Sequence, residues 1–368
     1  MDVADGSKGE KRVTPLGQRI AALIAAGGPI SIAEFMTMAL HDREAGYYAT
    51  RDPFGAAGDF ITAPEVSQMF GELIGLWLAQ VWIDQGKPQR PLLVELGPGR
   101  GALMADALRA MKLVPEFRAE LDVLLVEASP TLQKAQEETL RDCGVKIHWT
   151  DSFTSATGGR QLYLIANEFF DALPVRQYVK TERGWCERMV TLDKNGALVF
   201  AAAPSPIAAA LVPANRDGAP PGGVYEASAA GEAIAEEIAH AIARDGGAAL
   251  VIDYGYSKPG FGETLQAVSG HTFADVLGHP GASDLSAHVD FAALGEAAKR
   301  GGAAAYGPVE QGAFLISLGI VERAEKLSRN HLQDMTVELD RLTKPEQMGT
   351  LFKAIAIVPK SAPVPPGF

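Results

Sequence analysis

Cysteine, basic residues and long apolar runs are all scarce in this sequence of 368 residues. The two cysteines, Cys143 and Cys186, are too few for a disulfide framework or a cysteine metal site, which favours a reducing compartment such as the cytoplasm. Lysine and arginine total 33 against 45 aspartate and glutamate residues, and the net charge of −12 disfavours nucleic-acid binding, which needs clustered positive charge. No apolar run approaches the ~18 residues of a membrane span, so we expect no membrane-spanning segment.

Apolar residues nevertheless make up 47% of the chain, which excludes disorder of the whole chain. The length is at the upper limit for one hydrophobic core, so we expect one large domain with insertions, or two domains. Residues 1–13 are polar and carry acidic side chains, so we expect a disordered tail there rather than a signal or transit peptide.

Residues 14–90 are predicted to form an N-terminal helical region with a lid. Two helices lie within residues 16–41, and Ser31 with Glu34 predicts a capping box at the start of the second. Thr62–Glu65 has the same spacing and predicts another capping box before a strongly apolar helix. The glycine- and aromatic-rich stretch between these helices, residues 46–62, is interpreted either as a lid hinged at its glycines or as an ordinary packed loop.

In the middle of the chain, short apolar runs alternate with helical patterns, which is typical of a parallel sheet with crossover helices. The predicted strands are residues 92–96, 123–127, 145–149, 162–166 and 248–253. A β insertion over residues 175–230 is expected to contain antiparallel strands at 175–179, 185–192 and 198–202, a hairpin turn at 193–196 and a loop at 203–224.

The last third of the chain is predicted from weaker patterns. A glycine- and histidine-rich stretch over residues 255–288 is followed by mostly helical segments, and a final strand is expected at 352–358. Residues 256–350 would supply loops and helices on the substrate side. The tail, residues 359–368, holds four prolines and is expected to be extended.

The most informative motif is the stretch from Glu95 to Gly101, where a strand leads through a glycine turn into a helix. Glycines let the backbone turn tightly and let a ligand approach, and a helix N-terminus favours negative groups. Such a turn also occurs for packing reasons alone. The G-x-G-x-G spacing differs from the G-x-G-x-x-G of nicotinamide-binding folds, which disfavours an NAD oxidoreductase.

Polar residues also end the next three strands, at Glu127, Asp151 and Asn167-Glu168. Ligands of open α/β sheets bind beyond the carboxyl ends of the strands, so these residues outline one adenosine-sized crevice. This series fits a sheet that binds S-adenosylmethionine (SAM) better than it fits a dehydrogenase. Taken alone, Glu127 could equally be a solvated acid at a strand end.

The segment after the fourth strand, Asn167 to Pro174, carries two acids that would share a face if a helical turn begins there. Glu168 and Asp171 could then clamp a guanidinium, whose planar fork favours carboxylates. The alternative is that these acids only favour a helix N-terminus.

With these motifs together, the chain resembles the MidA-like family of SAM-dependent methyltransferases, which includes a mitochondrial arginine methyltransferase needed for assembly of respiratory complex I. The resemblance covers residues ~45–355. The matching stretches are Gly58–Ser67, Glu95–Gly101, Glu127–Pro130, Ala166–Pro174, Asp253–Gly255, Thr264–Ala267 and Asp284–Phe291.

The resemblance implies a Rossmann-like class I methyltransferase fold, with residues 91–255 and 303–358 forming the SAM-binding domain. Family members methylate an arginine of a complex I core subunit to symmetric dimethylarginine, so a protein substrate of this kind is the expected partner. By position, the residues that would bind SAM are Thr62, Pro64, Glu95, Gly97, Pro98, Gly99, Gly101, Glu127, Ala128, Ser129, Asp151, Ser152 and Asn167.

Catalysis is expected to rest on carboxylates, because a guanidinium stays protonated and must be oriented before it can attack. Glu168 is the main candidate, assisted by Asp171, Asn167 or Asp253. Substrate contacts are expected at Phe170, His271 and His288, and the histidine spacing predicts no metal site. A small-molecule methyltransferase, a SAM-binding assembly chaperone without turnover, and a homodimer remain open alternatives.

Overall fold

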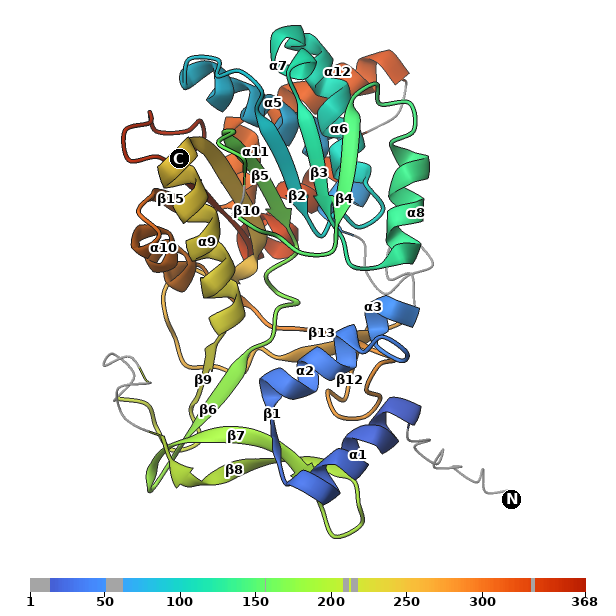
Figure 1. Cartoon of the computed structure of the whole chain (residues 1–368), viewed down its shortest axis with the longest axis vertical. Coiled ribbons are helices and arrows are strands. Elements are labelled where there is room, and N and C mark those ends of the chain that lie inside the picture. Colours follow the sequence, from blue (N-terminus) through green and yellow to red (C-terminus); the bar gives the residue numbers. More distant parts are fainter. Residues whose placement is uncertain (1–13, 51–61, 156, 208–211, 213–217, 332–334) are drawn as a thin grey trace.

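The computed structural model describes residues 14–50, 62–155, 157–207, 212, 218–331 and 335–368. Its largest sheet confirms the predicted α/β fold (Figure 1). The strand order is β15 (Ala304–Glu310), β16 (Phe352–Val358), β10 (Gly247–Tyr256), β5 (Leu162–Asn167), β2 (Leu92–Leu96), β3 (Asp122–Val126) and β4 (Lys146–Thr150). The five predicted parallel strands are confirmed, and the short β14 (Val289–Asp290) also pairs with β10.

The last strand, β16, enters the sheet between two earlier strands. It pairs antiparallel with β10 on one side and with β15 on the other. Because β15 is also antiparallel to β16, β16 alone runs against the common direction of this sheet.

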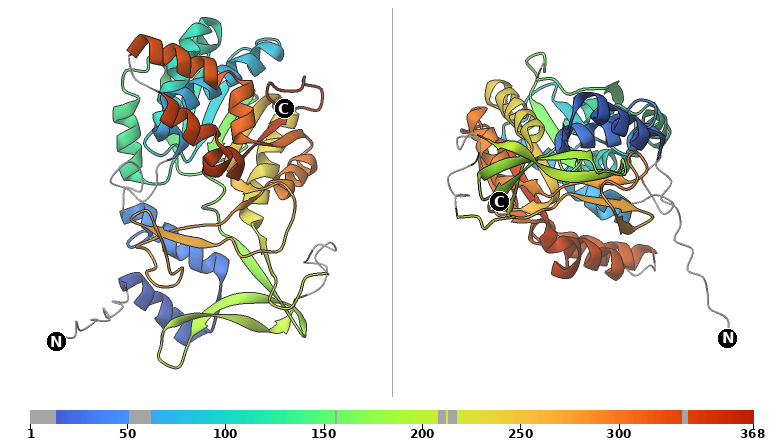
Figure 2. Two further views of the ribbon diagram at one scale, coloured as in Figure 1. Left: turned by 180° about the vertical axis from the view of Figure 1, so that it is seen from behind. Right: turned by 90° about the horizontal axis from the view of Figure 1, so that it is seen from below.

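Helices cover both faces of the sheet, which explains why its strands are continuous apolar runs rather than alternating ones. Leu250 and Ile252 pack on one face, with α5 (Gln68–Asp84), α6 (Ala102–Ala110), α11 (Gln311–Ser317) and α12 (Ile320–His331). Ala249 and Val251 pack on the other face, with α9 (Ala229–Asp245) and α10 (Phe291–Arg300). Seen from behind, the C-terminal helices, including α13 (Thr336–Thr343), lie over the face that α5 covers (Figure 2).

A second region lies below this sheet in Figure 1 and has its own core around Ile20, Phe35, Val190 and Leu285. One sheet of this region contains β1 (Ile30–Ser31), β7 (Gly184–Leu192), β6 (Arg176–Thr181), β9 (Val224–Ala227) and β8 (Leu198–Pro206). Another contains β12 (Thr272–Ala274), β11 (Gln266–Ser269) and β13 (Asp284–Ser286). The helices here are α1 (Pro15–Gly27), α2 (Ile32–His41) and α3 (Tyr47–Thr50).

The capping predictions had different outcomes. The box at Ser31 is confirmed: its hydroxyl accepts from the Glu34 amide, and the Glu34 carboxylate accepts from the Ser31 amide. The second box is wrong, because the Thr62 side chain makes no capping bond at α4 (Ala63–Val66). The Ala63 amide donates instead to Glu168 Oε1 at 2.9 Å, so a distant carboxylate takes one of the free N–H groups of this helix end.

Other differences concern short or interrupted strands. The predicted loop at 203–224 is wrong at its start, because β8 continues to Pro206. The three-stranded sheet within residues 255–288 and strand β15 were not predicted. At the other end of the chain, the tail folds back, with the ring of Phe368 5.2 Å from that of Phe314.

Candidate active site

A pocket of about 390 Å³ opens at the carboxyl end of β2 and β5. It brings together many of the predicted donor residues with the N-terminus of α4. Its lining comprises Thr62, Pro64, Glu65, Glu95, Gly97, Pro98, Gly99, Arg100, Ala102, Leu103, Asn167 and Glu168. Glu65, Arg100, Ala102 and Leu103 were missed, although the first two lie inside motifs that the sequence had already singled out.

The glycine loop between β2 and α6 forms the floor of this pocket. Gly97 has a φ of +61°, in the left-handed region that favours glycine, and a Cβ on it would lie 3.0 Å from Cδ2 of Phe169. Gly101 precedes α6 with a φ of +84° but does not line the pocket. Both the backbone conformation at this position and the space beside the Phe169 ring therefore require glycine at Gly97.

Two buried oxygens in this pocket have no hydrogen-bond partner among the described residues: Glu95 Oε2 and Asn167 Oδ1. Glu95 is 3% exposed, and its burial raises the pKa of the carboxyl group to about 8. A buried acceptor without a donor is costly, so this pair calls for a ligand that brings N–H groups. The cationic amino group of a methionine moiety has this chemistry, so the residues present fit SAM.

The predicted nucleoside residues lie further along the same edge and do not line this pocket. Glu127 Oε1 accepts from the Ser129 amide at 2.8 Å, and burial raises the pKa of Glu127. Ser129 caps α8 (Pro130–Thr139), whereas Ala128, Asp151 and Ser152 are exposed. Because β3 and β4 run parallel to β2, these residues extend the edge that begins at Glu95. Their contact with an adenosine stays a prediction.

Glu168 lies directly after β5, in an unusual backbone conformation. Its φ is +51°, which is uncommon for a residue with a side chain and occurs often at functional sites. Its Oε1 accepts from the Ala63 amide at 2.9 Å and from Asn167 Nδ2 at 3.2 Å. Burial is the main cause that raises the pKa of Glu168 to about 7, so both protonation states are populated near neutral pH.

The helical turn considered at Glu168–Asp171 does not form. Instead, the backbone amides of Phe169, Phe170 and Asp171 all donate to Asp253 Oδ2, at 3.1, 2.9 and 3.2 Å. This carboxylate thus folds the loop around itself and prevents those amides from continuing a helix. Burial and the nearby acids Asp171 and Glu168 raise the pKa of Asp253, whereas the amides favour its ionised form.

Asp171 is fixed by a tyrosine that was not among the predicted site residues. The Tyr254 hydroxyl donates to Asp171 Oδ2 at 2.6 Å, and Asp171 Oδ1 is buried with no partner among the described residues. Burial raises the pKa of Asp171, and the Tyr254 bond opposes that shift. Nearby, the Tyr48 hydroxyl donates to Asp284 Oδ1 at 3.1 Å, which ties the N-terminal region to β13.

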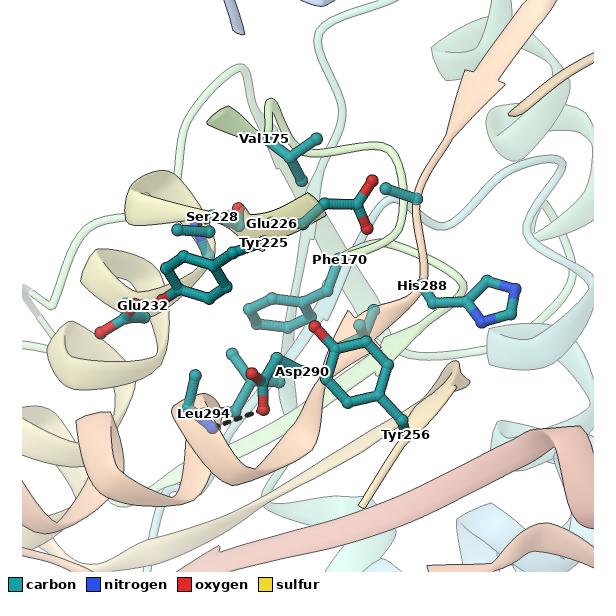
Figure 3. A pocket seen from close by; sticks show the side chains of 15 residues that line it. Phe170, Val175, Tyr225, Glu226, Ser228, Glu232, Tyr256, His288, Asp290 and Leu294 are labelled. Atoms are coloured by element: carbon teal, nitrogen blue, oxygen red, sulfur yellow. Dashed lines mark hydrogen bonds between the residues drawn. The ribbon is translucent and has the colours of Figure 1, made fainter. Parts of the chain in front are cut away.

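The predicted substrate residues separate in the structure. Phe170 and His288 line a second cavity (Figure 3), whereas His271 is exposed in the turn between β11 and β12 and lines neither cavity. Most of the predicted lid over residues 46–62 lies outside the described residues. Within the described part of the chain, no group of three or more His, Cys, Asp or Glu residues is arranged to hold a metal ion.

The sheet order, with one antiparallel strand next to the last, defines the class I fold of SAM-dependent methyltransferases. The buried acid and glycine loop at the end of β2 fit the same class. Residues 73–309 match the family described as S-adenosyl-L-methionine-dependent methyltransferases.

Curated relatives extend this match over nearly the whole chain. The protein is 36% identical to the mitochondrial protein arginine methyltransferase NDUFAF7 of Danio rerio, over 93% of this chain and 86% of that one. It is also 36% identical to the human protein of the same name, over 95% and 85%. The chain therefore belongs to this family of SAM-dependent methyltransferases.

A solved structure gives the same result. The chain is similar to the solved structure of a protein from Burkholderia thailandensis that contains bound S-adenosyl-homocysteine. The TM-score between the two is 0.84, their sequences are 31% identical, and the match covers 96% of this chain and 93% of that one. This chain is thus an enzyme that uses SAM as methyl donor. No helix in the described segments is both long and apolar enough to cross a membrane.

Proposed function

We propose that the protein is an arginine methyltransferase that acts on another protein. The observation that carries this proposal is the cluster of carboxylates beside the donor pocket, with Asp171 and Asp253 buried and Glu168 half-buried. A guanidinium is the nucleophile that most needs such a surrounding, since it is always charged in water and binds carboxylates with a planar fork. The relatives named as protein arginine methyltransferases support the same acceptor.

Bound SAM supplies an electrophilic methyl group on a sulfonium. The residues of this chain then have three tasks. Glu95 and Asn167 hold the donor at its amino end through their unpartnered oxygens. Glu168 orients the guanidinium and takes up the proton that the nitrogen loses, for which a pKa of about 7 is well suited. Burial excludes water, and Asp253 and Tyr254 fix the loop that carries these groups.

The resemblance of the sequence to the MidA-like family extends the proposal to the acceptor. We infer that it is a core subunit of respiratory complex I, that the product is symmetric dimethylarginine, and that methylation supports complex assembly. A cytoplasmic location and a homodimer belong to the same proposal. The relatives themselves are named as mitochondrial.

The proposal is tested with labelled SAM, the purified protein and lysate from a strain that lacks its gene. We expect label in one protein, on arginine, and symmetric dimethylarginine in its hydrolysate. Label confined to the small-molecule fraction would instead support a small-molecule methyltransferase. SAM binding without any label would support an assembly chaperone without turnover, and either result would overturn the proposal.

A further inference from the structure

The second cavity, with about 470 Å³ of space that is partly open to solvent, shares one loop with the active site (Figure 3). Asn167 and Glu168 line the donor pocket, and Phe170, two residues further on, lines this second cavity. The remaining walls come from β9, the start of α9, the end of β10, and the segment from Ala287 to Leu294. The proposed function assigns no ligand to this space.

The lining of this cavity is aromatic and acidic. Phe170, Tyr225 and Tyr256 contribute rings, and Glu226, Glu232 and Asp290 contribute carboxylates, but no lysine or arginine is among the described residues that line it. Figure 3 shows the side chains of Asp290 and Tyr256 beside the ring of Phe170, whereas the carboxylate of Glu226 points away from that ring. Aromatic faces with carboxylates beside them attract organic cations.

The side chain of Glu226 is held in a fixed position by hydrogen bonds. It is 6% exposed, and its Oε1 accepts from Gln177 Nε2 at 2.7 Å, from the Thr264 amide at 3.0 Å and from the Leu265 amide at 3.1 Å. Its Oε2 accepts from the Thr264 hydroxyl. These donors are all neutral, and Glu226 forms no ion pair within the described part of the chain. Glu232, in contrast, already pairs with Arg300 at 2.9 Å.

Backbone and ring contacts join the cavity to the acceptor loop. The Ala287 amide donates to the carbonyl oxygen of Asp171 at 2.9 Å, and Ala287 also lines the cavity. The ring of His288 lies 5.4 Å from that of Tyr254, whose hydroxyl binds Asp171. The cavity wall and the carboxylates of the active site therefore form one connected structure.

Resting on the proposed function, we propose that this cavity is a subsite for a second basic side chain of the acceptor protein. This lysine or arginine lies within four residues of the methylated arginine in the acceptor sequence. An extended chain advances ~3.3–3.6 Å per residue, so a few residues of acceptor span the distance along the loop from Glu168 to Phe170. The subsite would select acceptors by charge next to the arginine.

The test uses the full chain with S-adenosyl-homocysteine and nonapeptides of Ala, Ser and Gly around a central arginine. One lysine is moved through all eight other positions, and alanine, norleucine and glutamate versions serve as comparisons. Calorimetry should give about tenfold tighter binding with lysine than with alanine or norleucine at one or two adjacent positions. Glutamate there should weaken binding.

Variants then locate the effect. Asp290→Asn keeps an oxygen for the Ala293 amide, which Asp290 caps at 3.0 Å, and should remove most of the lysine preference. Glu226→Gln should do the same, but it disturbs several hydrogen bonds, so its folding is checked by urea denaturation. The control is Glu236→Gln, since Glu236 lies one turn from Glu232, also pairs with Arg300 and does not line the cavity.

Two results would overturn the subsite: equal or absent binding of all peptides, or a lysine preference that survives Asp290→Asn. Methyl transfer from labelled SAM is measured on the same peptides to separate the two proposals. Positional preference without label on the central arginine would count against arginine methylation and leave the subsite standing. Label on the central arginine without any positional preference for lysine would support arginine methylation and count against the subsite.

Discussion

The donor pocket and the acceptor carboxylates meet at Glu168, but they hold their polar groups in opposite ways. In the donor pocket, the buried oxygens of Glu95 and Asn167 have no donor within the described chain. Around the acceptor site, Asp253 and one oxygen of Asp171 are engaged by backbone amides and a tyrosine. The donor side thus leaves buried acceptor oxygens for a ligand to satisfy, whereas the acceptor side, apart from Asp171 Oδ1, uses protein donors to fix geometry.

The largest expected effect comes from the residue that both sides share. Glu168→Gln keeps an oxygen for the Ala63 amide but removes the group that takes up the proton. We expect kcat to fall about 100- to 1000-fold, while the Kd for SAM changes little. The wild-type rate should rise with pH through about 7, where Glu168 ionises, and this rise should vanish in the variant.

The control for that variant is Glu237→Gln. Glu237 lies on α9 and accepts from the Ser155 amide at 2.8 Å, as Glu168 accepts from Ala63, but it lines neither cavity. The methyl-transfer rate of the Glu237→Gln variant should match that of the wild type. Full activity of Glu168→Gln would contradict the role of base.

Glu95→Gln should affect the donor side alone. A charge-assisted hydrogen bond contributes about 1.5–3 kcal/mol, so SAM binding should weaken by about 10- to 100-fold. Because the pKa of Glu95 is raised to about 8, a cationic donor must displace a proton below that pH. Wild-type affinity should therefore increase with pH up to about 8, by at most about tenfold per unit.

Calorimetry between pH 6.5 and 9 checks this dependence. The variant is measured in parallel, because it reports the donor's own titration without that of Glu95. A wild-type pH profile identical to that of the variant would show that Glu95 is not the titrating group.

Tyr254→Phe tests whether the acceptor side depends on geometry. Tyr254 acts through Asp171, and loss of one hydrogen bond should lower kcat/KM for the acceptor about 3- to 10-fold. This bond lowers the pKa of Asp171, so its removal should keep Asp171 protonated to a higher pH. Because the charge of Asp171 raises the pKa of Glu168, the rising part of the pH–rate profile should then move to lower pH. SAM affinity should not change.

Tyr163→Phe is the matched control. The buried hydroxyl of Tyr163 forms hydrogen bonds with Gln85 and Gln161, both at 3.2 Å, and Tyr163 lines neither cavity. A loss of rate in Tyr254→Phe without any shift of the pH profile would indicate a merely structural role.

The smallest expected effect compares the two helix starts. Ser31→Ala removes a complete capping box and should lower the free energy of unfolding by about 1 kcal/mol. Thr62→Ala should change it by less than about 0.5 kcal/mol, because Thr62 makes no capping bond and Glu168 takes the Ala63 amide instead. Urea denaturation measures both, and equal losses would contradict this difference.

Local sequence patterns could predict the residues of the donor pocket because these residues lie directly at the ends of strands. Glu95, Gly97 and Asn167 each lie at or just after a continuous apolar strand, and parallel register then brings those ends together. The acceptor side depends on contacts between distant segments. Tyr48 and Asp284 are 236 residues apart, and no periodicity relates them.

Specific tertiary contacts also explain where the structure departs from the local sequence patterns. The turn at Glu168–Asp171 follows helical spacing, but Asp253 takes the amides that a helix would use. Strand β15 was missed because Gly307 and Pro308 interrupt its pattern, and its register shifts between Tyr306 and Val309. At the turn, a carboxylate far away in sequence outweighs the local spacing, and at β15 pairing with β16 forms a strand despite the interruption.

The position of β16 has a consequence for protein synthesis. A ribosome releases β10 and β15 before it makes residues 352–358, which must then enter between them. Until that moment, one edge of β10 presents unpaired amides and carbonyls, which can pair wrongly with strands of other chains. The SAM-binding sheet can thus be completed only after translation has passed residue 358, which gives molecular chaperones a defined interval in which to act.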